Sequence, residues 1–103
     1  MDRVISLKRL RAFWQRHPDS EEQLRRWYRR ALKASWHHLQ DVRADYPHAD
    51  AVVVASGRPV TVFNTCGNKY RLIVDIVYSA QVIYVCEVLT HAEYSKNRWK
   101  DKL

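Results

Sequence analysis

Residues 60–78, VTVFNTCGNKYRLIVDIVY, decide the fold. They consist of two runs rich in β-branched and aromatic residues, 60–65 and 69–78, on either side of the tripeptide Cys66-Gly67-Asn68. A short loop that contains glycine joins antiparallel neighbours in a hairpin. The stretch therefore predicts two antiparallel strands joined by a tight turn.

Two further runs extend this hairpin in both directions. Residues 51–55 are apolar and are followed by a turn sequence, SGRP, at 56–59, whereas residues 82–88 follow a short turn at 79–81. Short turns place consecutive strands side by side and antiparallel. The second half of the chain therefore predicts a four-stranded β-meander.

The first half of the chain has helical periodicity. Leu7, Leu10, Trp14 and His17 share one face of a helix that Ser6 can cap and that ends before Pro18. Residues 3–5 are a candidate short strand, and residues 39–44 are a candidate third helix.

A second helix is predicted to begin at residues 19–20. Ser20 and Gln23 have the spacing of a capping box, and the residues of the expected buried stripe are Leu24, Trp27, Tyr28 and Ala31. Helices followed by a run of strands indicate an α+β fold, with N-terminal helices packed on one face of a small, mainly antiparallel sheet. At 103 residues the chain is expected to form a single domain, residues 1–103.

Composition restricts the function. The chain has 18 Lys and Arg against 11 Asp and Glu, a formal charge of +7, which favours a polyanionic partner such as nucleic acid, an acidic membrane or an acidic protein. A hydrophobic content of 47% argues against disorder, and no apolar run approaches the ~20 residues of a membrane span. The N-terminus lacks the apolar stretch of a signal peptide, so we expect a reducing, cytoplasmic location.

The cysteines and histidines do not have the spacing of a metal-binding site. Cys66 and Cys86 do not make a disulfide framework, and the adjacent pair His37-His38 lacks the spacing of a zinc site. We therefore expect no metal. Trp99, in a polar tail, is the tryptophan most expected to contact a partner.

Strict alternation along residues 69–78 predicts two different faces. Tyr70, Leu72 and Val74 point to the helices, while Lys69 and Arg71 lie together on the other face. Two cations at this spacing can grip one phosphate group. The alternative is a solvated sheet face.

The five residues after the last predicted strand are Thr90-His91-Ala92-Glu93-Tyr94. A histidine, a carboxylate and a phenol can perform general acid–base catalysis near neutral pH. Antiparallel pairing would place them near the Lys69 end of the neighbouring strand. The alternative is a polar turn with Tyr94 folded onto the core.

The third charged feature lies on the second predicted helix. Its cations form two rows of like charge, in which neighbours repel, so that an anionic partner would relieve the repulsion. The alternative is a solvated helix face. The residues are Arg25, Arg26, Arg29, Arg30 and Lys33.

Several segments together resemble the HigB toxins, which are related in fold to RelE toxins. The segments are RVISLKRLRAFWQRHP (3–18), LRRWY (24–28), VFNTCGNKYRLIV (62–74) and LTHAEY (89–94). The resemblance implies a RelE-like α+β domain that cleaves translated mRNA on the ribosome, without a metal or organic cofactor. It also implies a cognate helix-turn-helix antitoxin, which inhibits the toxin and represses the operon as a complex on operator DNA.

Residue by residue, the resemblance assigns Lys69, Arg71, His91, Glu93 and Tyr94 to the catalytic site. It implies metal-independent attack of the RNA 2′-hydroxyl on the adjacent phosphorus. The cations would stabilise charge, and the division of proton transfer among His91, Glu93 and Tyr94 is open. Cys86 stands where some relatives have arginine.

Contacts with rRNA, mRNA or antitoxin are expected from the charged row of the second helix and from Asn68. Three alternatives to a nuclease stay open. They are a ribosome-binding module without catalysis, a DNA-binding protein that uses the second helix, and a catalytically weak or inactive toxin homologue that its antitoxin still binds.

Overall fold

The computed structural model describes residues 1–103. Its strands are β1 (Arg3–Ile5), β2 (Asp50–Val53), β3 (Pro59–Thr65), β4 (Tyr70–Val77) and β5 (Val82–Thr90). Its helices are α1 (Leu7–Arg16), α2 (Glu21–Lys33), α3 (Leu39–Asp45), α4 (His91–Ser95) and α5 (Trp99–Lys102), with 3-10 turns at Pro18–Ser20 and Tyr78–Ala80. No helix combines the length and apolar character needed to cross a membrane.

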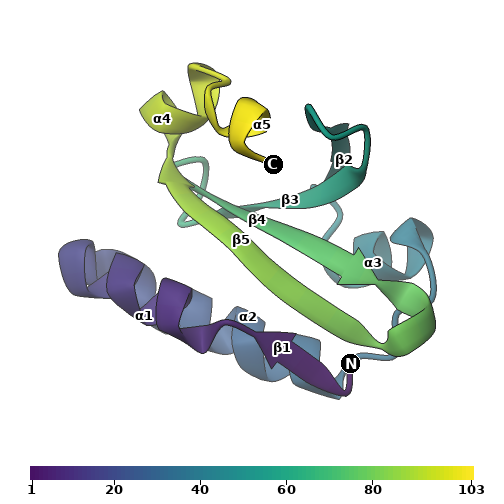
Figure 1. Ribbon diagram of the computed structural model, residues 1–103. Coiled ribbons are helices and arrows are strands. Elements are labelled where there is room, and N and C mark those ends of the chain that lie inside the picture. The colour runs from purple at the N-terminus through teal and green to yellow at the C-terminus, as the bar shows by residue number, and fades with distance from the viewer.

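The strands form one sheet in the order β1-β5-β4-β3-β2 (Figure 1). The pairs β2–β3, β3–β4 and β4–β5 are antiparallel, so the predicted meander is confirmed. β1 adds a parallel pair with β5, which makes the sheet mixed but mostly antiparallel. The chain thus has the α+β architecture expected from its sequence.

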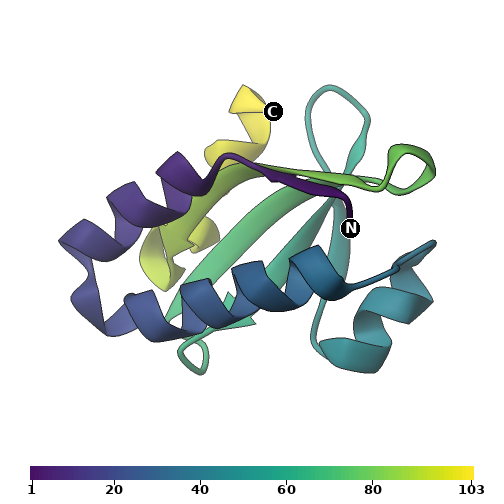
Figure 2. The same ribbon diagram turned by 90° about the horizontal axis from the view of Figure 1, so that it is seen from below.

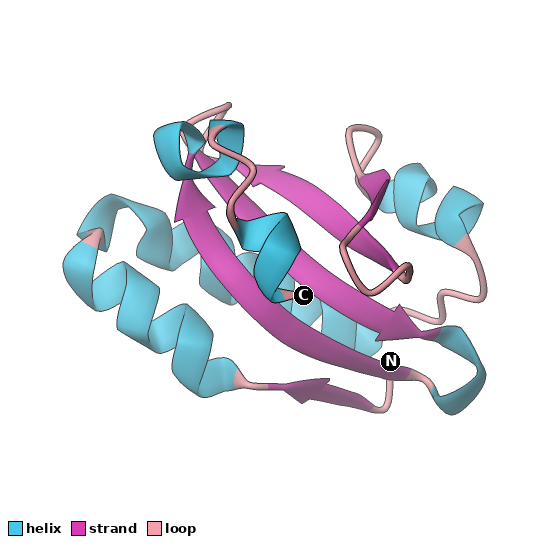
Figure 3. Ribbon diagram, turned by 45° about the horizontal axis from the view of Figure 1, so that its top comes forward, coloured by secondary structure: helices cyan, strands magenta, loops and turns pink.

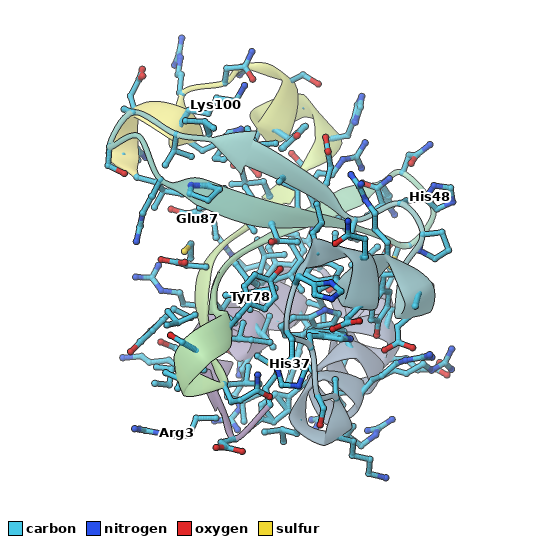
Figure 4. The ribbon with its side chains drawn as sticks, turned by 90° about the vertical axis from the view of Figure 1, so that its right-hand side faces the viewer. Arg3, His37, His48, Tyr78, Glu87 and Lys100 are labelled. Carbon is cyan, nitrogen blue, oxygen red and sulfur yellow. The ribbon has the colours of Figure 1, made fainter.

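Helices cover both faces of the sheet. α1 and α2 lie on one face (Figure 2), and α4 and α5 lie on the other. Figure 4 shows the two sides together, with Lys100 of α5 above the sheet and His37, which follows α2, below it. The predicted helical layer is confirmed, and a second covering layer accompanies it.

The main core lies between α1, α2 and the sheet. It is a cluster of 18 buried residues that includes Leu10, Trp27, Leu72 and Val74. The predicted stripe of α2 faces this core, with Tyr28 half-buried at its margin. Burial of this apolar surface is the main favourable contribution to folding.

A second, smaller core lies on the opposite face. Its buried members are Val54, Val60, Val62, Ile73 and Trp99. Trp99 is 4% exposed, so its expected role as a partner contact is wrong. The reason is that the apolar face of β3 and β4 gives this indole a place to bury, which draws the polar tail back over the sheet.

The two predicted side-chain caps do not form. Ser6 stands at the N-cap of α1 without a side-chain hydrogen bond. Residues 18–20 form a 3-10 turn, so Ser20 donates its hydroxyl to the carbonyl of His17 instead of capping α2. Gln23 instead accepts a hydrogen bond from the backbone N–H of Cys66 (2.7 Å), which ties α2 to the β3–β4 turn.

A bulge interrupts β5. Ile73 pairs with Glu87 and Val74 pairs with Val85, so Cys86 is an extra residue on this strand. The alternation of side chains between the two faces of the sheet is therefore broken in β5 after Val85. Val88 turns into the main core, while Cys86 packs against the second core.

Candidate active site

The end of β5 meets the start of β4 at one edge of the sheet. Tyr70 pairs with Thr90, and the backbone N–H of His91 donates to the carbonyl of Lys69 (3.0 Å). α4 therefore begins beside the first residues of β4, as the antiparallel pairing predicted.

Arg71 is the centre of the cluster that results. Its side chain is only 8% exposed, and Nη1 donates to the carbonyls of Asn68 (2.8 Å) and Tyr70 (3.3 Å). Nη2 lies 3.2 Å from Nδ1 of His91, and Cζ lies 5.3 Å from the ring centroid of Tyr94. Three of the predicted site residues are thus in contact.

The contact between Arg71 and His91 defines a tautomer. A guanidinium has only donors, so Nδ1 of His91 must accept this hydrogen bond, and the proton of the neutral ring lies on Nε2. His91 is exposed, and Nε2 forms no hydrogen bond within the chain. The imidazole is therefore oriented by Arg71 and open to a ligand.

Tyr94 supports the guanidinium from one side. Its ring stacks on Trp99 with centroids 5.2 Å apart, and Trp99 Nε1 donates to the carbonyl of Tyr94 (3.0 Å). Burial raises the pKa of the Tyr94 hydroxyl, although the nearby Arg71 opposes this effect. The phenol stays protonated at neutral pH and provides a surface for the cation.

Glu93 has a different environment. Its carboxylate accepts a hydrogen bond from the backbone N–H of Thr90 (3.0 Å), and Thr90 Oγ1 accepts one from the N–H of Glu93 (3.2 Å). This is a complete capping box at the start of α4. The N–H of Thr90 holds the pKa of Glu93 below its usual range, so the carboxylate is a weak base.

Lys69 does not join Arg71. Its ammonium lies 2.5 Å from Oδ2 of Asp19, whose Oδ1 accepts a hydrogen bond from the Tyr70 hydroxyl (2.8 Å). These contacts lie on the face covered by α1, because Tyr70 belongs to the main core. The prediction that Lys69 and Arg71 share one face is wrong. Lys69 precedes β4, so the alternation of side chains between the two faces of the sheet does not apply to it.

The pairing of Lys69 with Asp19 affects both ionisations. The hydrogen bond to Asp19 raises the pKa of Lys69, and the bonds from Lys69 and Tyr70 lower the pKa of Asp19. Asn68, by contrast, lies at the site, because its carbonyl holds Arg71 while its side chain accepts a bond from Asn64 (3.3 Å).

Cys86 supplies no charge to the cluster. Its thiol is half-buried, lies 3.6 Å from the carbonyl of Tyr84, and has a pKa raised by burial. It lies on the same side of the sheet as Trp99, against the second core.

The cations of α2 lie on the helical layer, across the sheet from Arg71. Arg25 pairs with Glu21 (2.7 Å) and Arg26 pairs with Glu22 (3.0 Å). Arg30 pairs with Asp45 (2.9 Å), whereas Arg29 and Lys33 are exposed and form no ion pair. The expected repulsion along these rows is therefore largely offset within the chain.

A groove near the site was not predicted from the sequence. It has a volume of about 430 Å³ and lies between the end of α1 and the C-terminal helices. Its polar lining includes Arg16, His17, Lys96, Arg98 and Lys102. No local spacing could have revealed it, because its two walls are about eighty residues apart in the chain.

No group of three or more His, Cys, Asp or Glu side chains is placed to hold a metal ion.

Comparison with known proteins gives one family. The model of HigB_toxin, the RelE-like toxic component of a toxin-antitoxin system, matches residues 20–97. No curated protein matches the chain. The matched region runs from the start of α2 to the residues after α4 and includes every residue of the cluster around Arg71.

Proposed function

The chain belongs to the HigB family of RelE-like toxins, and we propose that it is a ribosome-dependent endoribonuclease that cleaves mRNA. Toxins of this family are typically mRNA interferases. The observation that carries the proposal is the contact of the buried Arg71 guanidinium with an exposed imidazole, at 3.2 Å. A fixed cation beside a proton-transfer group is what cleavage of a phosphodiester requires.

Cleavage proceeds by attack of the 2′-oxygen on the adjacent phosphorus. The bond from phosphorus to the 5′-oxygen breaks, which leaves a 2′,3′-cyclic phosphate and a 5′-hydroxyl. A phosphoryl oxygen competes with His91 for Nη2 of Arg71, and this exchange frees Nδ1 of His91. The imidazole then takes the 2′-hydroxyl proton and delivers it to the leaving 5′-oxygen.

The other members of the site act through these two residues. Tyr94 and the carbonyl of Asn68 hold the guanidinium in place. Glu93 caps α4, and Lys69 links the β3–β4 turn to Asp19. Of the five residues first assigned to catalysis, Arg71 and His91 touch the RNA, and the other three position them.

The proposed partners are those typical of the family. Residues 1–103 are the toxin domain, a helix-turn-helix antitoxin inhibits it, and operator DNA is bound only by their complex. The unpaired cations of α2, Arg29 and Lys33, provide a contact to rRNA. The site of action is the ribosome in the cytoplasm.

The test compares wild type with His91→Gln and Arg71→Lys after induced expression, with the 5′ ends of mRNA mapped. Wild type should produce new 5′-hydroxyl ends, and each variant should lower their yield by about 10²-fold or more. Thermal melting shows whether the variants fold, because Arg71 is buried. Normal cleavage by folded His91→Gln contradicts the assigned role of His91.

A second candidate is a toxin homologue that binds RNA or the ribosome with little cleavage. Two observations favour it, since Lys69 is paired with Asp19 and position 86 holds a half-buried thiol. Arg71 is then the only cation in contact with His91. Growth arrest by the wild type without new mRNA ends would identify this activity.

A further inference from the structure

The groove between α1 and the C-terminal helices adjoins the proposed active site. Figure 3 shows these helices on either side of the end of β5. Its apolar lining residues are Phe13, Val88 and Trp99, which are buried, and Leu89, which is partly exposed. Leu89 is the cross-strand partner of Arg71, and Trp99 stacks on the Tyr94 ring that supports it. The groove therefore lies next to the residues that surround Arg71.

The rim of the groove carries an excess of positive charge. Its four cations are exposed and none forms an ion pair, in contrast to the paired arginines of α2; they are Arg16, Lys96, Arg98 and Lys102. The carboxylates in the lining are Glu93, which accepts the bond from Thr90, and Glu87. Four unpaired cations against two carboxylates favour an anionic ligand.

We propose that this groove binds one nucleotide of the RNA strand, one position beyond the two nucleotides that the cleaved bond joins. The inference rests on the proposed function and adds a second binding position to it. The phosphate meets the cations of the rim, and the base packs against Leu89, the apolar lining residue that is not fully buried. A volume of about 430 Å³ is within the ~300–1,000 Å³ of typical ligand pockets.

Glu87 favours a nucleotide over an acidic peptide from the antitoxin. Its carboxylate forms no hydrogen bond within the chain and is half-buried in the lining. The amino group of a base can donate to it, whereas carboxylates of an acidic peptide would be repelled. Arg16, Arg98 and Lys102 lie outside residues 20–97, the region that matches the family model.

The experiment measures binding of two uncleavable probes, a 2′-O-methyl dinucleotide and a 2′-O-methyl tetranucleotide, by fluorescence anisotropy. The groove variant is Arg98→Gln with Lys102→Gln. The matched control is Arg3→Gln with Lys8→Gln, which removes the same charge from exposed, unpaired positions on β1 and at the start of α1, away from the groove. All four positions are exposed, and thermal melting checks that both double variants fold.

Wild type and the control variant should bind the tetranucleotide about tenfold more tightly than the dinucleotide, because only the longer probe reaches the groove. The groove variant should bind the two probes with similar affinity. Its slope of log affinity against log salt for the tetranucleotide should fall by roughly 0.7 for each phosphate that the groove no longer neutralises.

Three results of the binding measurements overturn the inference. One is an unchanged preference for the tetranucleotide in the groove variant, and another is an equal weakening of this preference in the control variant. The third is a groove variant that binds RNA normally but no longer binds its antitoxin. Mapping of the 5′ ends of mRNA distinguishes this inference from the proposed function. If wild type binds through the groove but does not cleave mRNA, the proposed nuclease activity is wrong. If the groove substitutions leave cleavage unchanged, the proposed role of the groove is wrong.

Discussion

The contacts of Glu93 distinguish between two roles that its carboxylate could have. A carboxylate three residues after Thr90 is suited both to proton transfer and to closing a capping box. Here it accepts the N–H of Thr90 at 3.0 Å, which lowers its pKa and occupies it with the backbone. Its effect on the reaction passes through α4, whose first residue is His91.

Replacement of Glu93 by glutamine distinguishes these roles. Glutamine also closes a capping box, so Glu93→Gln should retain RNA cleavage within about threefold of wild type. Glu93→Ala removes the side-chain bond and should destabilise α4 by about 1 kcal/mol. The measurements are 5′-end yield and thermal melting, and a hundredfold loss in Glu93→Gln would mean that the carboxylate transfers a proton.

At the scale of elements, the sequence predicted the strands and helices well where side chains act locally. The β-branched run at β4 and the stripe from Leu24 to Ala31 on α2 depend on periodicity, and both are confirmed. The failures involve distant parts of the chain. Gln23 forms a hydrogen bond with Cys66, and Asp19 forms an ion pair with Lys69. A bulge at Cys86 changes which face of the sheet the following side chains of β5 point to.

The same division applies to the candidate site. The proximity of Arg71 and His91 followed from antiparallel pairing, which a sequence with short turns makes predictable. The separation of Lys69 from Arg71 could not be predicted in this way, because it depends on Asp19, fifty residues earlier in the chain. Spacing specifies which face a residue occupies only inside a strand, and Lys69 lies just outside β4.

The ion pair between Asp19 and Lys69 connects η1 (Pro18–Ser20) with the β3–β4 turn and should give a pH-dependent stability. The pKa of Asp19 is lowered on folding, so its contribution is present above the unfolded value of about 3.9 and is lost as pH falls through the folded pKa. The pKa of Lys69 is raised, so its contribution is present below about 10.4 and is lost as pH rises through the folded pKa.

The melting temperature of wild type should therefore exceed that of Asp19→Asn most between about pH 5 and pH 9. The difference should shrink at acidic pH as Asp19 is protonated, and at strongly alkaline pH as Lys69 is neutralised. Glu22→Gln, which removes an exposed carboxylate of α2, is the control. A pH-independent difference between wild type and Asp19→Asn contradicts the ion-pair origin.

At the scale of the whole molecule, the chain has two layers with different tasks. The layer of α1 and α2 contributes the main core, whereas α4 and α5 form a thin cover on the opposite face. Trp99 fixes that cover, because it is buried in the second core, stacks on Tyr94 and donates to the Tyr94 carbonyl. The site is thus held from below by β4 and from the side by the tail.

Truncation of Trp99 should accordingly affect both stability and function. Trp99→Ala removes a buried indole and should cost about 3–5 kcal/mol of unfolding free energy. Trp99→Phe keeps an aromatic ring against Tyr94 and should recover most of the RNA cleavage, although it lacks the bond from Nε1.

Leu39→Ala, at the margin of the main core, is a destabilising control remote from the site. If Trp99 positions Tyr94 and Arg71, cleavage measured well below the melting temperature falls in Trp99→Ala and not in Leu39→Ala. Equal activity of the two folded variants would reduce Trp99 to a stabilising role, since loss of stability alone leaves the chemistry of the folded fraction unchanged.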